Sequence, residues 1–180
     1  WQSLTFSLAT ETETSMRGEI IAIDLETTGL DPYTDFIIEI GAVRFKEGEI
    51  IETFSTLIDP GIPIPPRITA LTSIYDEDVT GAPQISDVVH DLRKFIGSTP
   101  LLGHRINFDV SFLEPFSVGL TNVLIDTYEL ASFLLPTAPR YNLTSLTEQL
   151  GLSDLTNDHG VRDDAINSCN LYWALWEKLM

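Results

Sequence analysis

The residues Ile20-Ile21-Ala22-Ile23-Asp24-Leu25-Glu26 determine the architecture of this chain more than any other segment. The four apolar residues are typical of a strand buried on both faces of an α/β sheet. Side chains two positions apart on a strand point to the same face, so Asp24 and Glu26 present neighbouring carboxylates. Ligand sites in open α/β sheets lie at such strand ends. The segment therefore predicts a central strand that ends in an acidic site, although an acidic pair also arises by chance in so acidic a protein.

Further strands and helices alternate along the rest of the chain. Gly48 separates two strand-like segments and indicates a hairpin, and four prolines make residues 59–66 a loop. Apolar residues at intervals of three and four predict helices in the second half. We expect strands at 36–45, 50–58, 100–103 and 123–125. We expect helices at 67–71 (short turns), after Pro83 with its apolar residues between 88 and 96, and at 108–116, 127–135, 143–150 and from 161 onwards. This order predicts a mixed central sheet flanked by helices.

The last predicted helix carries an apolar stripe at intervals of three and four, made of Ile166, Cys169, Trp173, Trp176 and Met180. On this stripe Cys169 is expected to be a packed thiol rather than a nucleophile. The two tryptophans are expected in the core or at an interdomain face. The helix reaches the last residue without a Gly or Pro stop signal. We therefore expect the domain to belong to a longer protein or to dock on a partner.

The composition describes an acidic single domain. The 180 residues carry 27 acidic and 10 basic side chains, a formal net charge of −17, which argues against a nucleic acid partner unless bound divalent metal reverses the field locally. We expect a domain over residues 16–180, preceded at 1–15 by a leader that is a disordered tail, an expression remnant or an upstream linker.

No apolar run reaches the roughly 18 to 20 residues of a membrane helix. The single cysteine fits a reducing compartment, so a cytoplasmic protein without membrane contact is expected.

Two more acids stand near predicted helix starts. Asp109 lies at the start of the helix at 108–116, and Asp164 lies in the first turn of the last helix, five residues after His159. Each acid alone is explained by a favourable interaction with the helix dipole. His159 and Asp164 share a site only if His159 comes from the loop that precedes the helix.

Together these residues resemble the DEDDh (DnaQ-like) family of 3′→5′ exonucleases, which includes proofreading subunits of bacterial DNA polymerase III and nuclease domains of helicases. The first motif is Asp24-Leu25-Glu26-Thr27-Thr28-Gly29, the second contains Phe108-Asp109, and the third is His159 followed by Asp164. Residues 68–72 and 82–83 also look like the family. The similarity covers residues 19–179, and three motifs in order are far more specific than any one of them.

The resemblance implies a ribonuclease-H-like fold and hydrolysis with two divalent metal ions, Mg²⁺ or Mn²⁺. The implied metal ligands are Asp24, bridging both ions, with Glu26 and Asp164 at one ion and Asp109 at the other. His159 is the implied general base. The implied substrate-binding residues are Thr27, Thr28, Leu30, His104, Arg105 and Phe108.

One residue departs from the family pattern. The family commonly has Asn directly after the histidine of the second motif, where this chain has Arg105, a residue suited to a phosphate.

Three functions stay open: a DNA exonuclease of proofreading or repair, an exonuclease that trims RNA, and an inactive nucleic-acid-binding module of a larger helicase or polymerase. All five catalytic positions are filled, which argues against the inactive module. The expected partners are the 3′ end of a nucleic acid, most of all DNA, and other polymerase or helicase domains.

Overall fold

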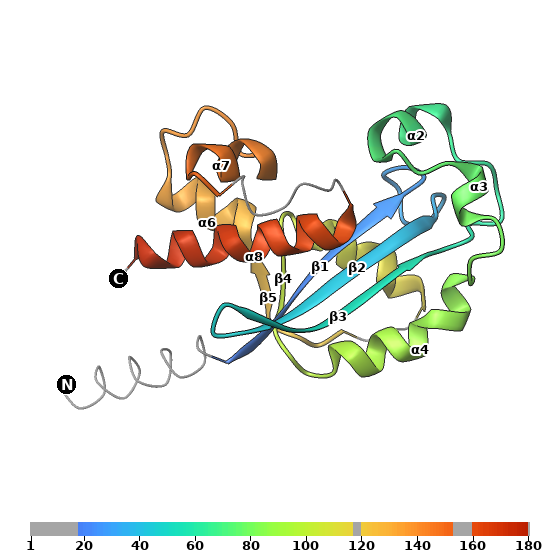
Figure 1. Ribbon diagram of the computed structural model, residues 1–180, viewed down its shortest axis with the longest axis horizontal. Helices are drawn as coiled ribbons and strands as arrows, with labels where there is room; N and C mark the ends of the chain where they lie inside the picture. Colours follow the sequence, from blue (N-terminus) through green and yellow to red (C-terminus); the bar gives the residue numbers. More distant parts are fainter. Residues whose placement is uncertain (1–17, 117–119, 153–159, 180) are drawn as a thin grey trace.

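The computed structural model describes residues 18–116, 120–152 and 160–179, so the expected leader at 1–15 lies outside the described residues. In the described part, five strands form one sheet in the order β3-β2-β1-β4-β5 (Figure 1). β1 pairs with β2 antiparallel and with β4 parallel, which confirms the predicted mixed sheet. The strands are β1 (Glu19–Thr27), β2 (Ile37–Lys46), β3 (Glu49–Leu57), β4 (Leu101–Gly103) and β5 (Leu124–Asp126).

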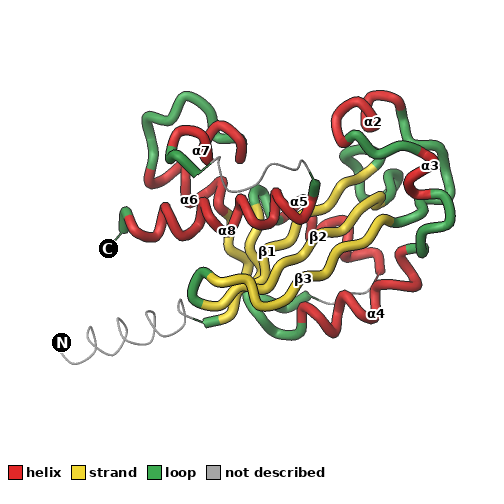
Figure 2. The backbone as a smooth tube through the Cα atoms, in the orientation of Figure 1, coloured by secondary structure: helices red, strands yellow, loops and turns green. Residues whose placement is uncertain are grey.

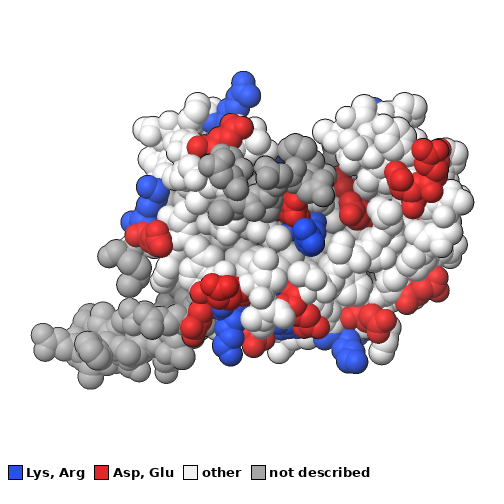
Figure 3. All heavy atoms as spheres, in the orientation of Figure 1, with Lys and Arg blue, Asp and Glu red and all other residues white. Residues whose placement is uncertain are grey.

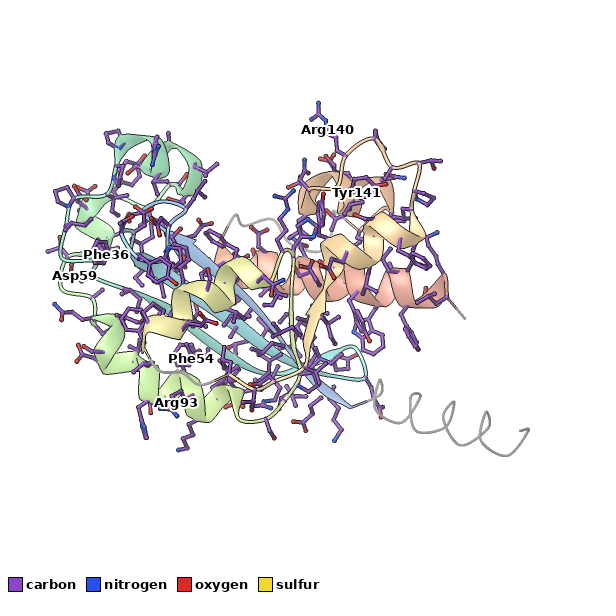
Figure 4. All side chains as sticks on the ribbon, turned by 180° about the vertical axis from the view of Figure 1, so that it is seen from behind. Phe36, Phe54, Asp59, Arg93, Arg140 and Tyr141 are labelled. Carbon is purple, nitrogen blue, oxygen red and sulfur yellow. The ribbon has the colours of Figure 1, made fainter. Side chains whose placement is uncertain are left out.

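Helices cover both faces of this sheet. Figure 1 and Figure 2 show α8 (Val161–Glu177) across one face of β1 and β2. The view from behind in Figure 4 shows α4 (Ile85–Ile96) and α5 (Asn107–Leu113) on the opposite face. The remaining helices are α2 (Pro66–Thr72), α3 (Asp76–Val79), α6 (Thr127–Leu134) and α7 (Leu143–Gln149), with a 3₁₀ turn at Glu114–Phe116.

The alternation of side chains along β1 assigns each of its faces to one layer. Ile21 and Ile23 pack with Leu92 of α4 and Phe112 of α5 in one buried cluster. Ile20 and its neighbours on the other face pack with α8 in a second cluster. Full burial of such side chains stabilises the fold by about 1.5–3 kcal/mol each. The period of two therefore directs Asp24 and Glu26 toward the α8 side of the sheet.

The predicted apolar stripe of α8 is partly wrong. Cys169 is fully buried, but Ile166, Trp173 and Trp176 are only half-buried, and Met180 lies outside the described residues. The reason is that α8 contacts two layers, the sheet and the α6–α7 pair, and so buries a face wider than one stripe. The buried residues are Ala165, Cys169 and Tyr172 toward the sheet and Leu171 and Leu175 toward α6 and α7.

Two helical pairs flank the end of β1. The α6–α7 pair packs on α8, and the α2–α3 pair packs around Ile38 at the start of β2 (Figure 1). The proline-rich segment forms the loop that leads into α2, as predicted. Among the described helices none is long and apolar enough to cross a membrane.

Candidate active site

The register of the two central strands sets the surroundings of Asp24 and Glu26. Across the antiparallel β1–β2 pair, Asp24 lies opposite Gly41 and Glu26 lies opposite Glu39. Glu39 was not predicted as a site residue, although an acid within the apolar run of β2 is the signal that could have found it. Like charges directly opposite each other across strands repel, so this register places an unfavourable charge pair at the end of the sheet.

Gly41 allows the N-terminal turn of α8 to lie directly on β2. A Cβ atom at this position would lie 2.6 Å from the carbonyl carbon of Val161 and 2.7 Å from the amide nitrogen of Arg162. Because α8 begins at Val161, Asp164 falls in its first turn, as predicted. The close approach therefore brings Asp164 toward Asp24, the residue that pairs with Gly41.

Asp109 joins the site from the opposite face of the sheet. It lies in the first turn of α5 and is only 3% exposed. Its Oδ1 accepts a 3.0 Å hydrogen bond from the backbone N–H of Leu25, between the two acids of β1. Burial raises the pKa of Asp109 to about 8, helped by the charges of Glu26 and Asp126 and opposed by its backbone hydrogen bonds.

The acids around the end of β1 form a carboxylate cluster in which their charges raise one another's pKa values. Burial raises the pKa of Asp24 well above its ordinary value, and the nearby charges of Asp109, Asp164, Glu26 and Glu39 raise it further. Burial, then Asp164 and Glu39, raises the pKa of Glu26 to about 7. The structure therefore places the four predicted acids within electrostatic range of one another and adds Glu39, whose own pKa is raised by burial; their role as metal ligands stays a prediction.

The chemistry of this cluster fits a divalent cation. Several carboxylates held together and desolvated favour either bound protons or a bound cation, and hard oxygen donors suit Mg²⁺ or Mn²⁺. In the described part of the chain, no group of three or more His, Cys, Asp or Glu side chains is close enough to hold a metal ion as it stands. The predicted general base, His159, lies outside the described residues.

The loop after β1 presents one apolar side chain to solvent. Leu30 is 83% exposed, whereas Thr27 and Thr28 are buried. The Thr27 hydroxyl donates to the carbonyl of Gly29, and the Thr28 hydroxyl accepts from the N–H of Phe36. Both threonine hydroxyls thus stabilise the loop that carries Leu30.

The predicted residues of the second motif differ in their surroundings. His104 bonds the hydroxyl of Thr127 through Nδ1 at 3.0 Å and the carbonyl of Tyr141 through Nε2 at 2.7 Å, and burial lowers its pKa. The ring of Phe108 lies 5.0 Å from that of Phe112 and packs against the core. These two side chains hold the β4–α5 turn in place, whereas Arg105 in that turn is exposed.

Other candidate groups are as expected from the sequence. Cys169 is buried, and burial raises the pKa of its thiol to about 12, as expected for a packed thiol. Figure 3 shows acidic side chains spread over the face that α8 covers, with basic side chains between them.

Comparisons with known proteins identify the family of this chain. A family model described as exonuclease matches residues 21–172. The subunit epsilon of DNA polymerase III from Treponema pallidum is 40% identical over 151 residues, which cover 80% of this chain and 70% of that protein. The PolC-type DNA polymerase III of Clostridium perfringens is 41% identical over 157 residues, 85% of this chain. The chain spans only 11% of the length of that polymerase.

Solved structures share the fold. Exonuclease X in complex with 5′ overhanging duplex DNA superposes with a TM-score of 0.69 and 26% identity, over 89% of this chain and 93% of that one. Exonuclease I of E. coli in complex with a dA16 oligonucleotide has a TM-score of 0.75 at 17% identity, over 89% of this chain and 41% of that one. The expected ribonuclease-H-like fold is thereby confirmed. Since the exonuclease model spans most of the chain and the acids of its motifs meet at one end of the sheet, this chain belongs to the exonuclease family.

Proposed function

We propose that this domain is a divalent-metal-dependent 3′→5′ exonuclease that hydrolyses DNA, preferably single-stranded, and releases 5′-mononucleotides. The observation that carries the proposal is the cluster of mutually perturbed carboxylates at the end of β1. Relatives whose structures contain DNA oligonucleotides support DNA as the substrate.

The four acids of the cluster have the role of metal ligands in this proposal. Asp24, Glu26, Asp109 and Asp164 would hold two divalent ions, Mg²⁺ or Mn²⁺, and the ions would supply activation of the attacking water and positive charge at the phosphate. His159 accepts the proton of that water as general base. Leu30 packs against the terminal base, and the buried Thr27 and Thr28 hold its loop in position.

The direct test uses 5′-labelled DNA oligonucleotides with a free or a blocked 3′ terminus. Wild type with Mg²⁺ or Mn²⁺ should shorten only the free-ended strand, one nucleotide at a time, and should stop in EDTA. Asp24→Asn should remove the activity and keep the fold. Equal degradation of the blocked strand, or full activity in EDTA, contradicts the proposal. Matched RNA oligonucleotides test the alternative of an RNA-trimming enzyme, because the discriminating contacts are made to the 2′-hydroxyl.

We further propose that the domain proofreads newly made DNA alongside polymerase domains, which would place it in the cytoplasm. The similarity to PolC-type polymerases and to the epsilon subunit supports this role. A proofreading domain should remove a mismatched 3′ nucleotide faster than a paired one, because a frayed end supplies the single strand. Equal rates on the two ends would contradict it.

A further inference from the structure

Arg105 adopts a backbone conformation that few side chains tolerate. Its φ is 68°, in the left-handed region, at the turn between β4 and α5. A non-glycine residue there costs roughly 1–2 kcal/mol, so the surroundings must impose the conformation. The imposing contact is a 3.0 Å hydrogen bond from the backbone N–H of Arg105 to Oδ1 of Asp126.

The side chain of Arg105 is held above an aromatic ring. Its guanidinium carbon lies 4.5 Å from the ring centroid of Tyr128. The same Oδ1 atom of Asp126 accepts the N–H of Tyr128 at 2.8 Å, so one carboxylate aligns both partners. Stacking engages the flat face of a guanidinium and leaves the N–H groups at its edge available for a planar acceptor.

No ion pair neutralises Arg105 among the described residues, and the same holds for other exposed cations such as Arg93 and Arg140. Arg44, Lys46 and Arg162 each lie within 4.0 Å of an acid. What distinguishes Arg105 from those exposed cations is that its guanidinium lies over the ring of Tyr128, directly after the strand that pairs with β1.

Arg105 flanks the catalytic carboxylates. It precedes Asp109 by four residues, and the charge of Asp126 contributes to the raised pKa of Asp109. In the sheet, β4 and β5 follow β1 in order, so the Arg105–Tyr128 pair lies one to two strands away from Asp24. Adjacent strands are about 5 Å apart, so the end of β4, which Arg105 follows, lies beside the end of β1 that carries Asp24.

We infer that Arg105, presented by Tyr128, binds a backbone phosphate of the substrate on the 5′ side of the scissile bond. The inference rests on the proposed exonuclease function and adds a contact that sets affinity for strands longer than one nucleotide. A guanidinium forms two parallel hydrogen bonds to phosphate oxygens, which gives both geometry and affinity.

Two substrates separate this contact from the catalytic step. The p-nitrophenyl ester of thymidine 5′-monophosphate contains the scissile phosphate alone, whereas oligothymidylate adds the upstream phosphates. Arg105→Ala should raise the KM for oligothymidylate roughly 10- to 100-fold, as expected for a lost charged hydrogen bond. The rise in KM for oligothymidylate should exceed any change in the hydrolysis of the ester, so the ratio of the two effects measures the upstream contact. Arg105→Gly should behave alike and fold at least as well, because glycine suits the positive φ.

A matched control removes a cation from another surface. Figure 4 shows Arg93 on α4, at the opposite end of the molecule from Arg140 and Tyr141 of the α6–α7 pair. Arg93→Ala changes the net charge equally and should leave the KM unaltered. Tyr128→Phe keeps the aromatic face and should retain most of the affinity, whereas Tyr128→Ala should raise the KM.

Replacing the phosphates of the oligonucleotide one at a time identifies the phosphate that Arg105 contacts. Replacing one phosphate at a time by uncharged methylphosphonate should weaken wild type at one upstream position and should not weaken Arg105→Ala there. The slope of log KM against log salt should fall by about 0.7 in the variant. Equal losses on ester and oligothymidylate, or the same methylphosphonate profile in both proteins, would overturn the inference. If wild type hydrolysed neither substrate, the proposed function would fail, and this inference with it.

Discussion

The backbone N–H of Leu25 donates a 3.0 Å hydrogen bond to the carboxylate of Asp109. This bond joins β1, which carries Asp24 and Glu26, to α5, which carries Asp109. The bond is buried, and Asp109 is 3% exposed. Leu25 separates Asp24 from Glu26, so the position of α5 is fixed relative to both carboxylates. Asp109 therefore accepts a hydrogen bond that holds the fold, a role separable from the charge that it is proposed to supply for metal.

Substitutions at Asp109 should separate these two roles. Asp109→Asn keeps a carbonyl oxygen for the Leu25 N–H, so it should fold with near-normal stability and lose hydrolysis. Asp109→Ala leaves the buried N–H without its acceptor and should lower the free energy of unfolding by about 1–3 kcal/mol as well. Urea unfolding and oligonucleotide hydrolysis measure the two effects. An active Asp109→Asn enzyme would remove Asp109 from the metal ligands.

Glu39 contributes repulsion to the cluster, because its charge raises the pKa values of Asp24 and Glu26. Glu39→Gln keeps the shape and removes this charge. The variant should therefore raise the melting temperature of the metal-free protein at neutral pH. Glu52→Gln on the exposed edge of β3 is the matched control and should have little effect. A lower melting temperature for Glu39→Gln alone would mean that Glu39 has a stabilising partner.

The metal-free protein should lose stability as the pH rises from about 4 to about 8. The folded state raises the pKa of Asp109 from 3.8 to about 8 and that of Glu26 from 4.5 to about 7. Within this window the folded state holds protons that the unfolded state has released, so a higher pH favours unfolding. Divalent metal binds the ionised acids, and its stabilisation should therefore be larger at pH 8 than at pH 5.

The net charge of −17 also destabilises the fold as the pH rises. The contribution of the perturbed acids to the pH dependence of stability therefore needs a control. Glu26→Gln removes one of the perturbed acids and should flatten the dependence of the unfolding free energy on pH. Chemical denaturation of both proteins in EDTA, at several pH values, measures the difference. Identical pH profiles would show that Glu26 titrates normally in the fold.

His159 should act in the proton transfer rather than in metal binding. His159→Ala should lower kcat by about 10²–10⁴-fold, the usual contribution of a general base. Metal affinity should stay nearly unchanged, and the rise of wild-type activity with pH should disappear from the variant's profile. A pH–rate series at saturating metal tests this expectation. A variant with near-normal kcat and the same acidic limb would exclude His159 as the base.

Local patterns predicted the element order and the shared face of Asp24 and Glu26, because a strand period of two and a helix period of 3.6 are properties of short segments. The prediction that Asp109 joins Asp24 and Glu26 required the family motifs, since Asp109 alone is also explained by a helix dipole. Glu39 was missed because its nearness to Glu26 depends on the register of two strands. The stripe of α8 was partly wrong because its burial depends on helices distant in sequence.

Gly41 should be required for the position of Asp164 more than for folding. A Cβ at this position would lie 2.6–2.7 Å from backbone atoms of Val161 and Arg162, so Gly41→Ala must push the first turn of α8 away from β2. The remainder of α8 keeps its buried contacts through residues such as Cys169 and Tyr172, so the variant should still fold, with a modest loss of stability. Hydrolysis should fall steeply, because metal ligands displaced by about 1 Å lose productive geometry. Trimming Val161 to alanine as well should not restore activity, since two of the three nearest atoms belong to the backbone. Full recovery in the Gly41→Ala/Val161→Ala double variant, measured by kcat at saturating metal, would show that the side chain and not the helix position sets the site.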